Sequence, residues 1–343
     1  MPLSVVWLGI GAFVATLIVV PLAQRVAILK GVTATPRDDR LHSVTTPYLG
    51  GVPIVLIVLA ASPFVGEWQT EAAVIVGGAA LLGVVGLLDD IRNLQPAPRL
   101  IAEVAAALLA VAVGAHVEIF GTIPDAILTV AWFVGVTNAF NLVDNMDGAA
   151  AGIASATAVA LTVSAALSHQ VLVGGLSAVV AGACLAFLIY NWHPARIFMG
   201  DAGTLPLGYL LAALALKLRF LPVDHLASVT AIVLFTTPAL FDTTLVVISR
   251  TARHKPIYQG GTDHTSHRLL RLGIPTRVVA SFITATAAAC AGLGVTVGRG
   301  ALPPIPVAAP IAVLSVAGMI ALLRLPAEAR IAATPHGSPA HSD

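Results

Sequence analysis

Two adjacent carboxylates, Asp89 and Asp90, stand at the end of an apolar stretch that is long enough to form a helix. Acidic side chains are unfavourable at a helix C-terminus, and neighbouring carboxylates next to lipid repel each other. A divalent cation that prefers oxygen ligands would remove that repulsion. The pair therefore indicates a cation site, with a solvated helix end as the simpler alternative.

A second polar cluster, residues 138–148, lies between two apolar stretches. Asn138 and Asn141 are one helical turn apart, so their amide oxygens can point in the same direction as the carboxylates that follow, Asp144 and Asp147. Asp147 alone would be an ordinary N-cap of the next helix. The density of polar side chains favours a binding or catalytic role instead.

A third cluster, residues 191–203, again joins two apolar stretches and contains Asn191, Phe198 and Asp201. Asp201 could be no more than a helix cap.

A fourth segment, residues 250–271, is rich in basic side chains. Part of this charge reflects the preference of Lys and Arg for the cytoplasmic side of a membrane. His264 and His267 beside Arg253 and Lys255 would also suit a diphosphate, because imidazole and guanidinium donors stabilise negative charge. Zinc is the rival interpretation for the histidines, but no cysteine lies nearby.

The composition indicates which elements must position these residues. The chain has 343 residues, 57% hydrophobic and 10% charged, with a mean hydropathy of +0.93. These values are typical of a membrane protein and leave no basic face for nucleic acid, which we exclude as a partner. We predict one transmembrane catalytic domain over residues 1–326 and a disordered cytoplasmic tail over residues 327–343. Cys184 and Cys290 lie in apolar stretches and are expected to be packing residues.

The apolar stretches predict an all-α, polytopic transmembrane bundle, because helices satisfy their own backbone hydrogen bonds in lipid. We predict eleven spans, with ten as the alternative count. Their approximate bounds are 3–22, 51–66, 72–88, 100–115, 124–140, 149–167, 171–190, 203–219, 226–248, 277–297 and 304–323.

Charge distribution predicts the orientation of these spans. With the N-terminus outside and the C-terminus in the cytoplasm, all but three of the 18 Lys and Arg residues fall on the cytoplasmic side. The exceptions are Lys217, Arg219 and Arg299. This agrees with the positive-inside rule. All four polar clusters then lie on the cytoplasmic face of the cell (inner) membrane, where they can form one site.

In this order, the clusters resemble those of the polyprenyl-phosphate N-acetylhexosamine-1-phosphate transferase family, which includes MraY, WecA and TagO. The resemblance covers Arg37 to Leu272. It begins with residues 40–51, whose end matches the Pro-x-x-Gly-Gly entry to the family's second span. It continues through the Asp pair, the Asn-x-x-Asn-x-x-Asp-x-x-Asp-Gly stretch, a Phe-x-Gly-Asp stretch and a late His-containing loop. Four motifs in order are far more specific than any one alone.

The resemblance implies that the protein transfers an N-acetylhexosamine 1-phosphate, favouring GlcNAc-1-phosphate, from a UDP-sugar to polyprenyl phosphate and releases UMP. Such a reaction would be the first membrane step of a cell-envelope glycan pathway. It implies Mg²⁺ as cofactor, with Mn²⁺ as an alternative. Asp201 would be the main ligand, with Asn141 and Asp90 in support, and Asp89 would handle the lipid phosphate. The substrates and the bilayer are then its partners, and a homodimer is left open.

Further roles are implied position by position. Asp144 matches an acid that is important for activity, and His264 and His267 match two histidines near the diphosphate. The expected substrate-binding residues are Asn138, Asp147, Asn191, Phe198, Arg253, Lys255 and Thr46.

Three positions depart from the family pattern. Asn93 stands where relatives carry Asp or Lys, Asn145 where Gly is usual beside the uracil, and Ser266 where a middle histidine is expected. Eleven spans favour the WecA and TagO branch over the ten-span MraY branch. The alternatives are a phospho-MurNAc-pentapeptide transferase of the MraY type, a secondary transporter and an intramembrane prenyltransferase.

Overall fold

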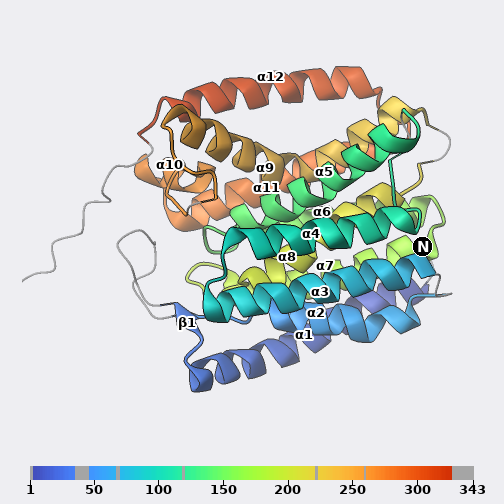
Figure 1. The fold of residues 1–343 in the computed structure, drawn as a ribbon. Coiled ribbons are helices and arrows are strands. Elements are labelled where there is room, and N and C mark those ends of the chain that lie inside the picture. The colour runs from blue at the N-terminus through green and yellow to red at the C-terminus, as the bar shows by residue number, and fades with distance from the viewer. Residues whose placement is uncertain are drawn as a thin grey trace, which may run out of the picture.

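The computed structural model describes residues 3–34, 46–66, 70–117, 120–220, 223–258 and 260–326. In these ranges the chain is a bundle of helices that lie roughly side by side (Figure 1). The long helices are α1 (Leu3–Lys30), α2 (Gly51–Ala61), α3 (Thr70–Arg92), α4 (Pro96–Ala112), α5 (Thr122–Leu142), α6 (Ala149–Leu167), α7 (Val171–Asn191), α8 (Asp201–Lys217), α9 (His225–Ala252), α11 (Thr276–Gly298) and α12 (Pro304–Leu323).

Four shorter elements complete the described chain. A 3-10 turn, η1 (Ser62–Phe64), follows α2, and helix α10 (Thr265–Arg271) lies between α9 and α11. The two-residue strands β1 (Thr33–Ala34) and β2 (Thr46–Pro47) pair antiparallel, with Thr33 opposite Pro47. Both β1 and α10 lie at the end of the bundle that is on the left in Figure 1.

The predicted all-α membrane bundle is confirmed. Each of the eleven predicted spans coincides with one of the long helices. Within the described ranges, eight of these helices are long and apolar enough to cross a membrane. The other three, α2, α4 and α8, have 11, 17 and 17 residues. The number of spans and the sides of the termini stay predictions, as does the division into one domain and a tail. Residues 40–45 of the first motif and the tail 327–343 lie outside the described residues.

Burial divides the bundle into central and peripheral helices. Of the residues in the most apolar 18-residue stretch of each helix, 72% are buried in α6 and 78% in α7, whereas none are buried in α12. Alanine is abundant in α6, which allows close packing of neighbouring helices. Helix α12 lies outermost, beyond α9 (Figure 1). Its exposed apolar face is what a bilayer would cover.

Two glycines let the helices approach the start of α8. A Cβ added at Gly86 of α3 would lie 2.1 Å from the carbonyl oxygen of Asp201. A Cβ added at Gly51 of α2 would lie 2.1 Å from the Cα of Gly203. No larger residue fits without moving backbone. These crossings hold the end of α3, with its two carboxylates, against the beginning of α8.

Candidate active site

The first group of site residues is an acid–amide cluster made of Asp89, Asp90, Arg99, Asn141 and Asp201. These residues come from the ends of α3 and α5 and the beginnings of α4 and α8. Arg99 lies between two carboxylates: its Nη1 is 2.6 Å from Oδ2 of Asp89 and 2.6 Å from Oδ2 of Asp201. Both ion pairs remain partly open, since the side chains of Arg99 and Asp201 are 21% and 22% exposed. A ligand can therefore reach them.

Asp90 fixes the position of Asp201. Its two carboxylate oxygens accept hydrogen bonds from the backbone N–H groups of Asp201 (2.9 Å) and Ala202 (3.0 Å). A carboxylate at this place satisfies N–H groups that the first turn of α8 leaves unpaired. Gly200, at φ +69°, precedes the helix, and a Cβ there would lie 2.6 Å from Oδ2 of Asp90. The observed geometry thus gives Asp90 a supporting task, and its role as a metal ligand stays a prediction.

Asn141 completes the cluster from α5. Its Nδ2 donates to Oδ1 of Asp201 (2.8 Å) and to the hydroxyl of Thr204 (2.9 Å). The side chains predicted to hold Mg²⁺, those of Asp90, Asn141 and Asp201, are thus in one place. Their oxygen atoms are the donor type that Mg²⁺ prefers. As the side chains stand, no group of three Asp, Glu, His or Cys residues within the described ranges is arranged to hold a metal ion. Arg99 supplies the positive charge between Asp89 and Asp201.

Asn138 lies apart from the acid–amide cluster in its contacts. It donates to the buried carboxylate of Glu103 and to the carbonyl of Val134 at 2.9 Å. Glu103, on α4, is only 2% exposed. Sequence reasoning did not select Glu103 or Arg99. The available signal was that both lie in the first helix after the Asp pair.

The loop between α5 and α6 connects the regions of the site. Asp144 is held there with Gly200 as its hydrogen-bonding neighbour. Burial raises the pKa of Asp144 to about 7, and the nearby charge of Asp90 adds to the shift. The turn ends at Gly148, whose φ of +75° favours glycine. Asp144 can therefore exchange a proton near neutral pH.

Asp147 and Asn191 join this loop to the segment after α7. Oδ2 of Asp147 lies 2.7 Å from Nδ1 of His193 and accepts from the N–H of Ala195 at 3.0 Å. Asn191 accepts from the N–H of Gly148 and donates to the carbonyl of Ile197, both at 3.0 Å. Both residues are almost fully buried. They shape this loop pair, and their predicted contacts with uridine are not tested by these hydrogen bonds.

Thr46 and Phe198 are neighbours through the backbone of the same region. The N–H of Phe198 donates to the carbonyl of Pro47 at 2.9 Å, and the N–H of Gly50 donates to the carbonyl of Phe198 at 2.9 Å. The rings of Tyr48 and Phe198 lie 5.7 Å apart. Thr46 is buried beside them in β2. The first motif of the sequence thus packs against the third.

The second group is a late-loop cluster made of Asp242, Arg250, Arg253, Asp263, His264, His267 and Arg268. Arg250 donates to both oxygens of Asp263 at 3.0 to 3.3 Å, and Arg253 donates to Oδ2 of Asp263 at 3.0 Å. Burial opposes ionisation of Asp263, but the hydrogen bonds and charge of Arg250 outweigh it and lower the pKa of Asp263 below its usual value. Lys255 lies on the exposed turn after α9.

The two histidines of this cluster have different surroundings. Nδ1 of His264 is 2.8 Å from Oδ2 of Asp242, whereas Nδ1 of His267 is 3.3 Å from the hydroxyl of Ser266. Burial lowers the pKa of His267 to about 4, and the neighbouring charge of His264 contributes to the shift. His267 is therefore neutral at pH 7. The predicted interaction of both histidines with a diphosphate stays a prediction.

Ser266 connects the late-loop cluster to the α5–α6 loop. Its hydroxyl hydrogen-bonds to the side-chain oxygen of Asn145, and these are two of the three positions that depart from the family pattern. Ser266 and Asn145 thus form a hydrogen bond at the two positions where the family pattern has a histidine and a glycine. The two departures thus concern one contact.

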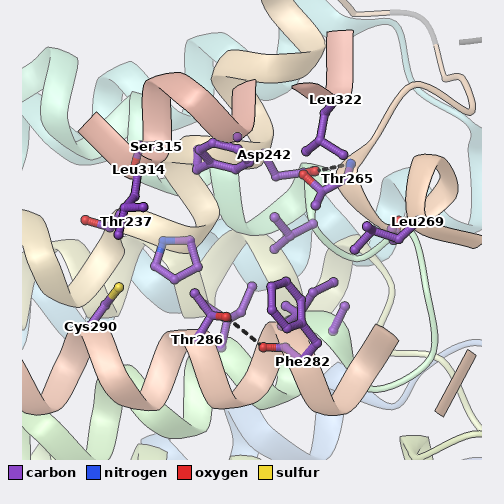
Figure 2. A pocket seen from close by; sticks show the side chains of 18 of the residues that line it. Thr237, Asp242, Thr265, Leu269, Phe282, Thr286, Cys290, Leu314, Ser315 and Leu322 are labelled. Carbon is purple, nitrogen blue, oxygen red and sulfur yellow. Dashed lines mark hydrogen bonds between the residues drawn. The ribbon is translucent and has the colours of Figure 1, made fainter. Parts of the chain in front are cut away.

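An apolar cavity of about 700 Å³ opens beside this contact. It is lined by α6, α9, α10, α11 and α12, and its apolar side chains include Phe241, Cys290 and Leu314. Cys290 and Leu314 are labelled in Figure 2. Its polar groups include Asn145, Asp242, Thr265 and Ser266. Size and lining are typical of a site for an apolar ligand with a polar end. The cavity was not predictable from the sequence, because its walls come from five separate helices.

Comparisons with known proteins show which proteins this chain resembles. The profile of the family described as "Glycosyl transferase family 4" matches residues 72–219. The "Probable undecaprenyl-phosphate N-acetylglucosaminyl 1-phosphate transferase" of Bacillus subtilis is 34% identical over 279 residues, covering 78% of this chain and 77% of that protein. The "Decaprenyl-phosphate N-acetylglucosaminephosphotransferase" of Mycolicibacterium smegmatis is 31% identical over 311 residues, covering 77% and 75%. A "Phospho-N-acetylmuramoyl-pentapeptide-transferase" of Desulforamulus reducens is 31% identical over 256 residues, covering 64% and 75%.

Proposed function

The chain belongs to glycosyl transferase family 4, and from that premise we propose that it transfers N-acetylglucosamine 1-phosphate from UDP-N-acetylglucosamine to a polyprenyl phosphate. An oxygen of the polyprenyl phosphate attacks the β-phosphorus of the UDP-sugar. The bond between that phosphorus and the bridging oxygen breaks, and UMP leaves. The observation that carries the proposal is the similarity, over at least three quarters of both chains, to proteins named for this reaction.

The acid–amide cluster would hold the divalent ion. Asp201 would be the main ligand, with Asn141 and Asp90 in support, and the ion would be Mg²⁺ or Mn²⁺. When bound, such an ion neutralises charge on the diphosphate and orients it. Asp90 keeps Asp201 in position through the start of α8. Arg99 would balance Asp89 and Asp201 before substrates arrive, and Asp89 would then orient the attacking phosphate.

The late loop would receive the anionic part of the donor. Arg253, Lys255 and His264 would donate hydrogen bonds to the diphosphate and stabilise charge on the leaving UMP. Neutral His267 would contribute a hydrogen bond without charge. Burial raises the pKa of Asp144 to about 7, so this carboxyl group would be able to take up or release a proton during turnover.

The remaining predicted residues would bind the nucleoside and the lipid. Asp147, Asn191, Phe198 and Thr46 would shape the uridine site, with Asn138 beside them. The cavity next to Ser266 would accept part of the prenyl chain, since its walls are apolar and it lies among the membrane helices. The site would lie on the cytoplasmic face of the inner (cell) membrane, because Lys and Arg residues are concentrated on that side in the predicted topology.

The direct test is exchange of labelled UMP into UDP-N-acetylglucosamine by purified protein. We expect exchange only with Mg²⁺ or Mn²⁺ and polyprenyl phosphate present. Its absence from protein that is folded in detergent or lipid would overturn the proposal. A transporter or a prenyltransferase would not support this exchange.

The donor is tested with a panel of UDP-GlcNAc, UDP-GalNAc and UDP-MurNAc-pentapeptide. We expect UDP-GlcNAc to have the highest kcat/KM. Preference for the pentapeptide donor would assign the chain to the phospho-MurNAc-pentapeptide transferase reaction, a name carried by relatives that match a smaller share of this chain.

A further inference from the structure

Asp242 is an acid buried well inside a helix that is long and apolar enough to cross a membrane. It lies ten residues before the end of α9 and is 5% exposed. An ionised side chain at such a depth is costly unless it is paired, so its partners indicate its purpose. Such an acid is expected to face protein or water and not lipid.

Both oxygens of Asp242 are used by the late loop. Oδ2 lies 2.8 Å from Nδ1 of His264, and Oδ1 accepts from the backbone N–H of Thr265 at 2.7 Å. The second contact is drawn in Figure 2, where Asp242 reaches from α9 to the start of α10. One carboxylate thus fixes both the backbone and the ring at the point where α10 begins.

This pairing determines which nitrogen of His264 carries hydrogen. An ionised carboxylate only accepts hydrogen bonds, so Nδ1 of His264 must donate to it. Nε2 is then the nitrogen left for another group, and a proton acquired there would be balanced by the carboxylate. His267 has no carboxylate on its Nδ1, where the hydroxyl of Ser266 lies 3.3 Å away. The two rings, 5.7 Å apart, are therefore set up differently.

From these contacts we infer that Asp242 is a positioning residue of the transfer reaction, which acts by holding His264 through Nδ1 and directing Nε2 to the substrate. The inference rests on the proposed function. The rival explanation is that Asp242 only anchors α10 to α9 and that the ring of His264 is incidental. The two explanations predict different activities for a variant that keeps the hydrogen bond from Thr265 to residue 242 but changes which nitrogen of His264 carries hydrogen.

Asp242→Asn makes this separation. The amide oxygen can still accept from Thr265, but the amide NH₂ would donate to Nδ1 of His264 and move the ring hydrogen to Nε2. We expect kcat to fall about 10- to 100-fold, the range seen when the partner of a functional histidine is removed, with KM for the UDP-sugar changed less than about twofold. Full activity would overturn the inference.

A double-mutant cycle asks whether the effect passes through His264. In a His264→Gln background, Asp242→Asn should cost little further activity, because the ring it positions is absent. Equal losses in both backgrounds would show that Asp242 acts independently of His264 and would refute the inference.

Asp125→Asn is the matched control. Asp125 of α5 is also a buried acid, 3% exposed, and its oxygens accept from the N–H groups of Phe120 and Gly121. It anchors a connection outside both clusters. We expect this variant to lower thermal stability in detergent without changing kcat.

His264→Asn covers the case in which Asp242→Asn fails to fold. The asparagine can still donate to Asp242, so the anchor remains while the imidazole is lost. We expect normal stability and a loss of kcat. An active His264→Asn protein would mean that Asp242 only anchors α10 to α9. If wild-type protein shows no transfer at all, the proposed function has failed.

A tautomer measurement separates that failure from failure of the inference. ¹⁵N spectra of histidine-labelled protein at pH 8 should contain an Nδ1-protonated ring that disappears in His264→Asn. In Asp242→Asn it should become Nε2-protonated. An unchanged tautomer would contradict the inference whatever the activity.

Discussion

The two clusters of the site treat charge in opposite ways. The acid–amide cluster contains three carboxylates, those of Asp89, Asp90 and Asp201, and one guanidinium, that of Arg99, which pairs with Asp89 and Asp201. In the late-loop cluster three guanidinium groups, those of Arg250, Arg253 and Arg268, outnumber two carboxylates, those of Asp242 and Asp263, and Asp263 is shared by Arg250 and Arg253. The first cluster has an excess of negative charge and the second an excess of positive charge. A cation and a diphosphate are the ligands that complement such a pair of clusters.

The clusters also differ in exposure. Asp201 and Arg99 are each about a fifth exposed, whereas the side chains of Arg250 and Asp263 are 4% and 3% exposed. Partly open ion pairs can be rearranged by a ligand at little cost, but buried ones cannot be broken without loss of stability. The comparison therefore suggests that the acid–amide cluster serves chemistry and that the Arg250–Asp263 pair serves structure. Four substitutions test this division.

Asp201→Ala should have the largest effect. It removes the expected main ligand without removing apolar packing, so we expect transfer to fall about 1000-fold or more while the thermal unfolding temperature changes little. Activity is measured by UMP exchange at saturating Mg²⁺, with Asp125→Asn as a control for loss of a buried carboxylate. Near-normal turnover would show that the acid–amide cluster is not the reaction centre.

Asp263→Ala should show the reverse pattern. It leaves buried Arg250, and with it Arg253, without their carboxylate, which typically costs about 3 to 5 kcal/mol. We expect a large drop in the unfolding temperature in detergent, and a loss of activity that follows the loss of folded protein. Asp263→Asn should be less harmful, because the amide oxygen still accepts from one guanidinium. A stable Asp263→Ala protein would contradict the structural role of this pair.

Sequence reasoning predicted the scaffold better than the contacts within the site. Run lengths of apolar residues were enough to place the eleven long helices, because a membrane requires long, uninterrupted apolar segments. Helix α10 was missed because its seven residues lie in a polar segment with no such requirement. Its position depends on the buried partners of its own loop.

Within the site, motif order predicted which side chains gather but not how they pair. Asp90, Asn141 and Asp201 were expected together and are together. Arg99 was counted only as a charge that sets orientation, because nothing in the sequence shows that it lies between two acids. The pairing of Asp242 with His264 joins positions 22 residues apart and depends on how the loop folds back onto α9. Such pairings follow from tertiary structure, which spacing alone does not specify.

His267 provides a pH test of the late-loop cluster. Its pKa of about 4 in the folded protein lies below the usual 6.5, so the unfolded chain binds a proton more readily between these values. The stability associated with neutral His267 is therefore present above pH 6.5 and is lost as the pH falls, by about 2 kcal/mol at pH 5. Asp263 does not interfere, since its lowered pKa moves its own contribution below pH 4.

The measurement compares unfolding temperatures in detergent at pH 7.5 and pH 5 for the wild type and His267→Gln. The variant should lose much less stability on acidification, because glutamine does not titrate. Equal acid sensitivity of the two proteins would show that His267 is not buried in the neutral form.

Arg99→Gln should have the smallest effect of the four substitutions. The direction in which it shifts the Mg²⁺ concentration for half-maximal activity shows whether Arg99 competes with the metal ion or supports it. Arg99 occupies the space between Asp89 and Asp201 as a cation, so it competes with a metal ion for the same oxygens. Losing one charged hydrogen bond of this kind is worth roughly 1.5 kcal/mol, which corresponds to about a tenfold lower Mg²⁺ concentration for half-maximal activity. Arg92→Gln, at the exposed end of α3, removes a charge nearby and should leave the Mg²⁺ requirement unchanged. A higher Mg²⁺ requirement in Arg99→Gln would contradict this competition. It would mean that the guanidinium of Arg99 helps the acid–amide cluster to bind the metal ion and takes part in the reaction centre.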